Sequence, residues 1–260
     1  MNFLLIVSKE DIASINFEKQ LFSYSFKNIS KDLYILDIDT KNKVYLTVTN
    51  DLHIYLKEED IVPNELKDIN QVIFLTKHST LNVNKPKCMT VHAIGNWGRA
   101  ELGGKDNTVV ETDPILIRKL LIELKRNKPK EIKEYEVKQE ATHHGPYLEI
   151  PTIFFEIGSQ ESDWSNEVVS SYMIKVLLDV IKDYNKEEIK KKKGWIEAVG
   201  VGGSHYCSKF NKKTYKDSNL YAFGHVVANY ALEDIENKPK LLEQAKQKSN
   251  SKVIIKEKDL

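Results

Sequence analysis

Histidine and glycine are unevenly placed along this chain of 260 residues. Six of the seven histidines share the glycine-containing part of the chain or end an apolar run: His78, His92, His143, His144, His205 and His225. None of the 11 glycines precedes Gly95. Neutral imidazole binds zinc and serves as a general base near neutral pH, and glycine lets the backbone approach a ligand closely. The pattern therefore predicts a ligand crevice lined by histidines, whereas His53, between two aliphatic residues, is interpreted as structural.

The histidines alone leave metal binding and ordinary hydrogen bonding equally open. The sequence contains no compact zinc signature such as HExxH or CxxC, so a metal site would have to collect ligands from distant strand ends. Adjacent His143 and His144 would face opposite ways on a strand, so we expect at most one of them to reach a given metal. Cys207, two residues after His205, is a candidate nucleophile, although a small buried thiol is the more common role for a free cysteine.

The elements that must position these residues follow from the apolar pattern. Strands are expected over residues 2–7, 33–39, 43–49, 71–76, 89–94, 134–139, 152–157, 196–201 and 252–255. Helices are expected from a capping box at Ser8 and Asp11 to about Phe22, from Asp113-Pro114, over 165–184 and over 239–248. The fold class is therefore α/β, most simply a three-layer α/β/α sandwich with a mixed, largely buried sheet, and residues 1–260 are expected to form one domain.

The composition excludes several classes of protein. Apolar residues make up 41%, and Lys and Arg (39) nearly balance Asp and Glu (38), so the net charge is only +1. That balance argues against a protein that coats nucleic acid with its whole surface. The first apolar run, residues 3–7, is too short to cross a bilayer and follows no basic leader, and two cysteines cannot form a disulfide framework. We therefore expect a cytoplasmic protein that does not span a membrane.

One segment departs from this charge balance. Residues 182–216 hold ten lysines and four acidic residues, a net charge of +6, interleaved with five aromatic rings. Lysines beside rings suit the end of a single-stranded nucleic acid, because phosphates attract the charges and bases stack on the rings. The run of lysines at 190–193, taken alone, is more typical of a solvated helix face.

Several motifs together resemble the archaeal-type D-aminoacyl-tRNA deacylase family, which also occurs in plants. In chain order they are His78-Ser79, Thr90-Val91-His92 with Gly95-Asn96 and Gly103-Gly104, Thr142-His143-His144-Gly145-Pro146, Phe155-Glu156-Ile157-Gly158-Ser159 ahead of Trp164, Gly200-Val201-Gly202-Gly203-Ser204-His205-Tyr206, and Phe223-Gly224-His225. The agreement spans nearly the whole chain. Two positions depart from the family pattern, with Lys77 in place of arginine and Tyr147 in place of a small hydroxylated residue. If Tyr147 lines the amino-acid pocket, it changes the range of accepted side chains.

The resemblance implies a single α/β domain related to the phosphorylase and peptidyl-tRNA hydrolase architecture, a monomer, and dependence on zinc, with one or two ions. It also implies hydrolysis of the ester that joins a D-amino acid to the 3′-terminal adenosine of tRNA, over a broad range of D-amino acids. The partner is then the acceptor end of D-aminoacyl-tRNA, with no obligate protein partner. Such an activity recycles mischarged tRNA and relieves D-amino-acid toxicity.

On this interpretation the candidate residues take three kinds of role. We expect His92, His205 and one of His78 or His143 to hold zinc and leave a position open for water. The catalytic candidates are His143, His144, Glu156 and His225, with Glu156 orienting a histidine or acting as a base and His144 as a second proton carrier. The substrate-binding candidates are Gly145, Pro146, Gly202, Gly203, Tyr206, Lys209, Lys212 and Lys213, with amides of Gly145 and Gly203 facing the oxyanion and residues 206–216 holding the acceptor end of tRNA.

Chiral selection requires a wall that admits hydrogen but no side chain on one side of the α-carbon. The backbone of His144-Gly145-Pro146 is the candidate wall, so Gly145→Ala is expected to lower activity by about tenfold or more while the fold is kept. Two other functions remain open. A zinc-dependent peptidase or amidase acting on small substrates needs the metal but no basic patch, and a non-catalytic RNA-binding protein needs the patch but not the histidines.

Overall fold

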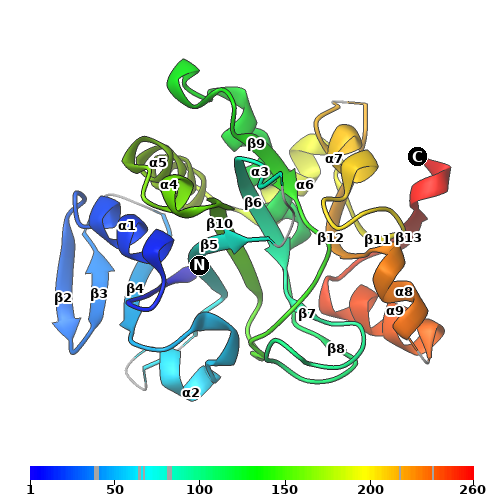
Figure 1. Cartoon of the computed structure of the whole chain (residues 1–260), viewed down its shortest axis with the longest axis horizontal. Coiled ribbons are helices and arrows are strands. Elements are labelled where there is room, and N and C mark those ends of the chain that lie inside the picture. Colours follow the sequence, from blue (N-terminus) through cyan, green and yellow to red (C-terminus); the bar gives the residue numbers. More distant parts are fainter. Residues whose placement is uncertain (38–40, 64–65, 67, 81–83, 217, 236) are drawn as a thin grey trace.

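The largest element of the fold is an eight-stranded mixed sheet (Figure 1). The computed structural model describes residues 1–37, 41–63, 66, 68–80, 84–216, 218–235 and 237–260. The strands lie across the sheet in the order β2 (Phe26–Ser30), β3 (Leu33–Leu36), β4 (Lys43–Thr49), β1 (Asn2–Ser8), β5 (Gln71–Ser79), β10 (Thr152–Ser159), β6 (Cys88–Ala93) and β9 (Glu136–Gln139). Strands β4, β1, β5 and β10 run parallel, whereas β6 is antiparallel to β10.

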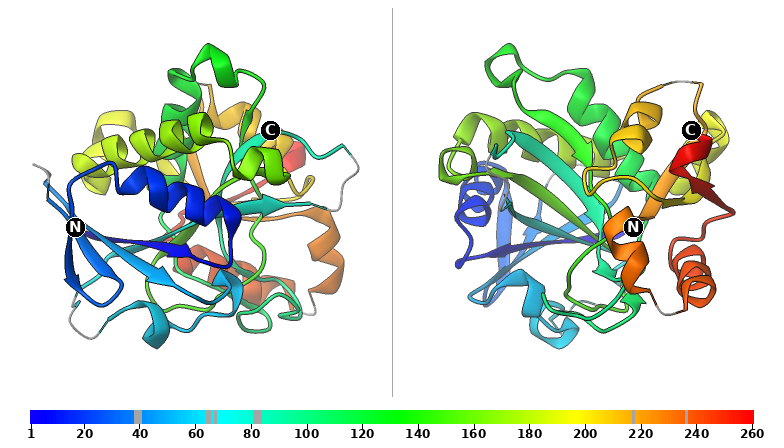
Figure 2. Two further views of the ribbon diagram at one scale, coloured as in Figure 1. Left: turned by 60° about the vertical axis from the view of Figure 1, so that its left-hand side comes forward. Right: turned by 45° about the vertical axis from the view of Figure 1, so that its right-hand side comes forward.

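Helices cover one face of this sheet, as Figure 2 shows. They are α1 (Ile12–Leu21), α3 (Pro114–Arg126), α4 (Glu161–Trp164) and α5 (Glu167–Lys182). The largest apolar cluster lies between them and the strands, and Phe17 of α1 and Met173 of α5 belong to it. Asp113 and Asn166 begin α3 and α5 by accepting hydrogen bonds from first-turn amides.

The opposite face is covered by short and irregular segments. They are α2 (Glu58–Ile61), the 3-10 turn η1 (His53–Tyr55) and residues 143–151. Phe74 of β5 and Phe154 of β10 belong to the apolar cluster on this face. Because side chains alternate along a strand, His78 and Glu156 project from the same face. The alternation therefore places polar side chains next to an apolar floor.

A second, three-stranded sheet lies on the far side of α3. Its order is β12 (Tyr221–Val227), β11 (Ile196–Val201) and β13 (Val253–Lys256), all parallel. The helices of this part are α6 (Lys186–Lys193), α7 (Ser208–Thr214), α8 (Asn229–Asp234) and α9 (Lys238–Lys248). A hairpin of β7 (Gly95–Asn96) and β8 (Thr108–Val109) lies below the main sheet in Figure 1, and two 3-10 turns, η2 (Lys130–Ile132) and η3 (Glu257–Asp259), complete the fold.

The expected α/β class with a large mixed sheet is confirmed, with the long helices on one face and the short helix α2 among irregular segments on the other. The capping box at Ser8 is wrong, since Ser8 ends β1 and Asp11 caps α1 by accepting from the amide of Ser14. The strand expected over 33–39 ends at Leu36, and residues 38–39 lie outside the described part of the chain. Strands β2 and β12 were not predicted, since charged or glycine residues interrupt their apolar runs. No helix among the described residues is long and apolar enough to cross a membrane.

Candidate active site

Glu156 lies at the centre of the site because its strand, β10, is paired with β5 on one side and β6 on the other. In these pairings Glu156 is in register with Thr76 and with Thr90. The two threonine hydroxyls donate hydrogen bonds to its carboxylate oxygens, at 2.9 Å from Thr76 and 3.1 Å from Thr90. His78 Nδ1 and His92 Nε2 lie 3.5 and 3.6 Å from the same carboxylate.

This contact sets the charge of all three groups. Burial opposes ionisation of Glu156, but hydrogen bonds from His78 and His92 outweigh it and hold the pKa of Glu156 well below its usual range. Burial also disfavours charge on the two histidines, and here the Glu156 carboxylate outweighs it and raises the pKa of both. The site therefore contains a buried carboxylate between two imidazoles that favour the protonated form.

Glu140, the residue after β9, is a second buried carboxylate in the site. Its side chain is fully buried. Imidazole nitrogens of His78, His205 and His143 lie 3.2, 3.4 and 4.0 Å from its oxygens. Neither oxygen accepts a well-formed hydrogen bond from the part of the chain that the structure describes. A buried carboxylate in this state needs a positive partner, either a protonated imidazole or a bound cation.

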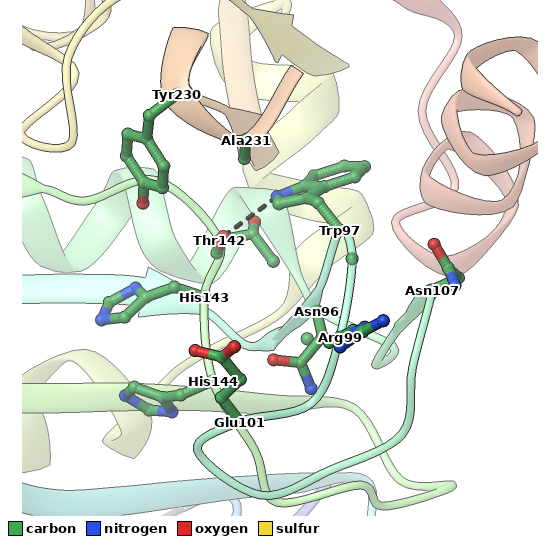
Figure 3. Close-up of a pocket in the computed structure, with 12 residues that line it drawn as sticks. Asn96, Trp97, Arg99, Glu101, Asn107, Thr142, His143, His144, Tyr230 and Ala231 are labelled. Carbon is green, nitrogen blue, oxygen red and sulfur yellow. Dashed lines mark hydrogen bonds between the residues drawn. The ribbon is translucent and has the colours of Figure 1, made fainter. Parts of the chain in front are cut away.

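His143 and His144 project side by side from the segment that follows Glu140 (Figure 3). Their ring centroids are 4.4 Å apart, and the ring of His92 lies 4.4 Å from His143. His144 has a φ of 48°, which is the left-handed region. The expectation that the two histidines face opposite ways is therefore wrong, because alternation holds only for an extended chain and His144 is not extended.

Burial and the neighbouring imidazoles favour the neutral form of His143 and His144. Burial, followed by the charge of His92, lowers the pKa of His144 to about 4. Burial and the neighbouring imidazoles, His144 first, hold the pKa of His143 well below its usual range. His78 and His92 therefore favour the protonated form while His143 and His144 favour the neutral form, which is the division that acid–base chemistry requires.

A cavity of about 620 Å³ opens over these groups. Five histidines line it together with Glu156: His53, His78, His143, His144 and His205. A second cavity of about 430 Å³, drawn in Figure 3, shares His143 and His144 with the first as lining residues. Asn96, Arg99 and Asn107 line this second cavity, and Tyr230 of α8 lines both. The predicted crevice of histidines is thus present, and its two chambers share lining residues.

Three groups of side chains bring potential ligand atoms within 4.8 Å of one another. They are His92, His143 and His144; Glu140, His143 and His205; and His78, Glu140 and Glu156. Among the described residues none of these groups joins His92 to His205, so the expected ligand set does not form a single centre. Two imidazoles and a carboxylate are ligands that zinc accepts, and the hydrogen-bond-free carboxylate of Glu140 fits a cation. The second group therefore fits zinc best.

The structure does not place His225 at the site. This histidine is fully buried in β12, and its Nδ1 atom lies 3.1 Å from the hydroxyl of Thr142. Burial, and then the charge of Lys248, lowers the pKa of His225 to about 3. Its contact with Thr142, the residue before His143, indicates a positioning role rather than the catalytic role predicted from the sequence.

The amide of Gly145 is also engaged elsewhere. It donates a hydrogen bond to the carbonyl of Leu102 at 3.0 Å, so the role predicted for it at the oxyanion is wrong. A Cβ atom added at Gly145 would lie 2.3 Å from the backbone nitrogen of Gly104, which contradicts the expectation that Gly145→Ala keeps the local fold. The next residue, Pro146, is buried. This segment therefore packs against the 98–107 loop.

Gly202 and Gly203 turn the chain between β11 and His205. Both have positive φ, 105° and 84°. Gly202 donates its amide to the carbonyl of Val227, and Gly203 packs against the side chain of Glu257. Neither glycine is among the residues that line the two chambers. Their position indicates a role in directing His205 into the site, whereas the predicted substrate contact finds no support.

Two predictions about neighbouring side chains have different outcomes. The hydroxyl of Tyr206 lies 3.1 Å from Nε2 of His78, and Tyr206 lines the larger chamber, as a substrate-binding residue must. Tyr147 lines a separate cavity, where Lys105 Nζ lies 3.5 Å from its ring centroid. Cys207 is fully buried, and burial raises the pKa of its thiol well above the usual range, so the nucleophile interpretation is not supported.

The basic segment divides between two helices. Lys209, Lys212 and Lys213 lie on α7, which begins two residues after Tyr206. On α6, Lys190 is paired with the buried carboxylate of Glu197 at 2.8 Å. The lysines of α7 are thus adjacent in sequence to the wall of the cavity, as the prediction for the acceptor end requires.

Sequence reasoning missed three residues of the site. Glu140 was recognisable, because a carboxylate stands there between an apolar strand and a His-His-Gly-Pro motif. Tyr230 donates to or accepts from His205 Nδ1 at 3.2 Å, and His53 lies 3.2 Å from the hydroxyl of Ser14 at the edge of the larger chamber. Neither of these two carried a local signal, since their partners come from distant segments.

Comparison with known proteins gives one family. The family model described as D-aminoacyl-tRNA deacylase matches residues 65–260. The D-aminoacyl-tRNA deacylase of Thermococcus kodakarensis is 32% identical over 235 residues, which are 88% of this chain and 80% of the relative. That of Methanocaldococcus jannaschii is 32% identical over 246 residues, which are 91% of this chain and 84% of the relative.

A solved structure extends the agreement to the fold. The crystal structure of a conserved protein described as being of unknown function superimposes with a TM-score of 0.83 and 28% identity. The match covers 98% of this chain and 86% of that one. The family model spans Glu140, Glu156 and the histidines from His78 onward. The chain therefore belongs to the D-aminoacyl-tRNA deacylase family.

Proposed function

We propose that this protein hydrolyses the ester between a D-amino acid and the 3′-terminal adenosine of tRNA. The observation that carries the proposal is the convergence of Glu140, Glu156 and five or more imidazoles around one cavity in a chain of this family. The products are free D-amino acid and tRNA. Because the substrate is tRNA, we place the activity in the cytoplasm, and we propose that the protein acts as a monomer.

Hydrolysis requires a group that takes a proton from water and one that gives a proton to the departing ribose hydroxyl. His144, with its pKa lowered to about 4, is neutral near pH 7 and is suited to accept the proton. His78, with its pKa raised, is suited to donate one, and its Nε2 atom is hydrogen-bonded to Tyr206 at the cavity wall. Glu156 lies against both His78 and His92 and favours the protonated form of each.

Zinc is the cofactor that we propose for this site. Glu140, His143 and His205 would hold it, because they combine two imidazoles with a buried carboxylate that no hydrogen bond satisfies. When bound, zinc lowers the pKa of a coordinated water and stabilises negative charge on a carbonyl oxygen. Neighbouring residues orient the two imidazole rings, since Tyr230 contacts His205 and the carbonyl of Ala141 lies 2.8 Å from His143 Nδ1.

A direct assay tests the proposal. Purified protein is incubated with D-Tyr-tRNA and with L-Tyr-tRNA, and release of tyrosine is followed with and without a chelator. We expect hydrolysis of the D-ester alone, and we expect the chelator to abolish it. Loss of activity after treatment with the chelator, restored by added zinc but by no other metal, would support zinc as the cofactor.

The same assay separates the two other functions. A zinc-dependent peptidase or amidase would leave both esters intact and would cleave small amides instead. A non-catalytic RNA-binding protein would retain tRNA on a filter without releasing tyrosine. Either result would contradict the proposed function. Retention of tRNA on the filter would then indicate the RNA-binding protein, and its absence the peptidase or amidase.

A further inference from the structure

Two of the large apolar side chains that the fold leaves exposed stand at the larger chamber. Leu52 is 44% exposed and Leu102 is 54% exposed, and both line the cavity that holds Glu156. Ile54 and Phe154 add apolar surface to the same cavity. Apolar side chains at a cavity mouth favour ligand binding, because the bound ligand removes their surface from contact with water.

Leu102 is fixed in this position by the loop that carries it. Its carbonyl accepts the amide of Gly145 at 3.0 Å, and Asn96 Nδ2 donates to the carbonyl of Gly103 at 2.8 Å. Gly103 lies so close to the carbonyl of Ile54 that an added Cβ atom would be 1.8 Å from its oxygen. The loop is thus fastened on both sides of the cavity, and Leu102 is a fixed part of the wall.

The second chamber has a different chemical character. Asn96, Arg99, Glu101 and Asn107 line it, so its lining is polar and carries charges of both signs. The two chambers share His143 and His144 as lining residues, and the reacting carbonyl would lie beside these histidines. The two sides of an aminoacyl ester also differ in character, since one carries the amino-acid side chain and the other carries ribose and phosphate. The larger chamber also holds charged side chains such as Lys77 and Glu156, and Leu52, Ile54 and Leu102 form its apolar part. Matching of polarity assigns this apolar part to the side chain.

We propose that Leu52, Ile54 and Leu102 form the subsite for the side chain of the aminoacyl group. The subsite prefers aromatic and aliphatic side chains to small or charged ones. This assignment rests on the proposed function, and it names the part of the substrate that this part of the cavity recognises.

The test introduces a charge into the subsite. Leu102→Asp and Leu52→Asp are assayed on D-Tyr-tRNA and D-Ala-tRNA, and kcat/KM is measured for each. We expect a loss of about tenfold or more with D-Tyr-tRNA and of about twofold or less with D-Ala-tRNA, because only the larger side chain reaches the leucines. Both leucines are exposed, so the variants keep the fold. The matched control is Val168→Asp, an equally exposed position (53%) in the first turn of α5, with no expected effect.

A binding measurement makes the result independent of hydrolysis. The probes are amide-linked analogues, the D-tyrosyl and D-alanyl derivatives of 3′-amino-3′-deoxyadenosine, which the reaction does not release. We expect the wild-type protein to bind the D-tyrosyl analogue more tightly and Leu102→Asp to remove that difference. Equal affinities in the wild-type protein, or an unchanged difference in the variant, would overturn the subsite. Failure of the wild-type protein to hydrolyse D-Tyr-tRNA while the difference in binding persists would overturn the proposed function and leave the subsite in place.

Discussion

The titratable groups of the site fall into two sets with opposite preferences. Glu156 raises the pKa of His78 and His92, while burial and mutual repulsion lower the pKa of His143 and His144. One set therefore binds protons more readily than a free histidine does, and the other binds them less readily. An ester hydrolase needs both at once, and here a single carboxylate on β10 separates them.

The Glu156→Gln variant tests this account. The neutral amide cannot hold protonated His78 and His92, so we expect kcat to fall by about a hundredfold or more. Measurement of kcat on D-Tyr-tRNA across pH checks it, because the limb set by the protonated histidines should move to lower pH. The matched control is Glu197→Gln, which removes another buried carboxylate, paired with Lys190, far from the cavity. A similar loss of kcat in both variants would mean that only stability was affected.

The Glu140→Gln variant tests the proposed zinc ligands. Glutamine has the same shape but no charge, so we expect zinc bound to the purified protein to fall by about tenfold or more. The measurement is elemental analysis of the protein after dialysis, which needs no assay of activity. His78→Gln serves as a comparison, because His78 contacts Glu140 but does not belong to the group of Glu140, His143 and His205. Loss of zinc in both variants would place the metal in the third group, which contains Glu140 and His78, and unchanged zinc in both would place it in the first group.

At the level of elements, the sequence predicted those helices whose ends are set by capping residues and by the apolar pattern close in the chain. Helices α3 and α5 begin where Asp113 and Asn166 can cap them and end where their apolar periods end, so both were visible in the sequence. The candidate histidines were visible by type, and the structure brings His78, His92, His143, His144 and His205 together. The ligand grouping was not visible, because it depends on the left-handed turn at His144 and on the antiparallel placement of β6, which no spacing in the sequence reports.

The contact between the 98–107 loop and the 143–146 segment leads to a prediction at this scale. In Gly145→Ala the new methyl group meets the backbone of Gly103 and Gly104 at less than 2.5 Å, so the loop must move. We expect the free energy of unfolding to fall by about 3 kcal/mol and kcat/KM to fall with it, since Leu102 moves with the loop. Urea unfolding and the hydrolysis assay measure both.

Gly194→Ala is the control for that variant. Its methyl group meets only a side-chain atom of Leu220, at 4.0 Å, and its cost of about 1 kcal/mol comes from the positive φ. We expect its activity to remain that of the wild-type protein. Wild-type stability and activity in Gly145→Ala would show that the two segments do not depend on each other.

At the scale of the whole molecule, buried neutral histidines make stability depend on pH. Burial lowers the pKa of His53 and of His225 to about 3, whereas an unfolded histidine titrates near 6.5. Between these values the unfolded chain binds one more proton at each position than the folded chain does. The free energy of unfolding should therefore be fully present above about pH 6.5 and fall by about 1.4 kcal/mol per pH unit for each histidine as the pH is lowered.

Urea unfolding of the wild-type protein and of His225→Gln between about pH 7 and 5 measures this effect. We expect the variant to be less stable at neutral pH but to lose less stability on acidification, by the contribution of one proton. Parallel curves for the two proteins would show that His225 takes up its proton in the folded state.

Attraction between the protein and tRNA should also depend on which lysines are present rather than on how many. In the sequence, residues 182–216 form one basic segment. In the fold this segment is divided between α6 and α7, and of these two helices α7 comes directly after Tyr206 of the cavity wall. Phosphate contacts release counterions, so KM for D-Tyr-tRNA should rise steeply with salt concentration while kcat changes little.

Replacing Lys209, Lys212 and Lys213 by glutamine removes these contacts and should lower the slope of log KM against log salt by about two, since each phosphate contact contributes about 0.7 to 0.9. The matched variant replaces Lys191, Lys192 and Lys193 of α6 by glutamine. These three lysines are exposed, and their replacement removes the same amount of charge. If both triple variants lowered the slope equally, net charge alone would govern association. If only the α7 variant does so, the acceptor end approaches along α7, next to the cavity wall at Tyr206.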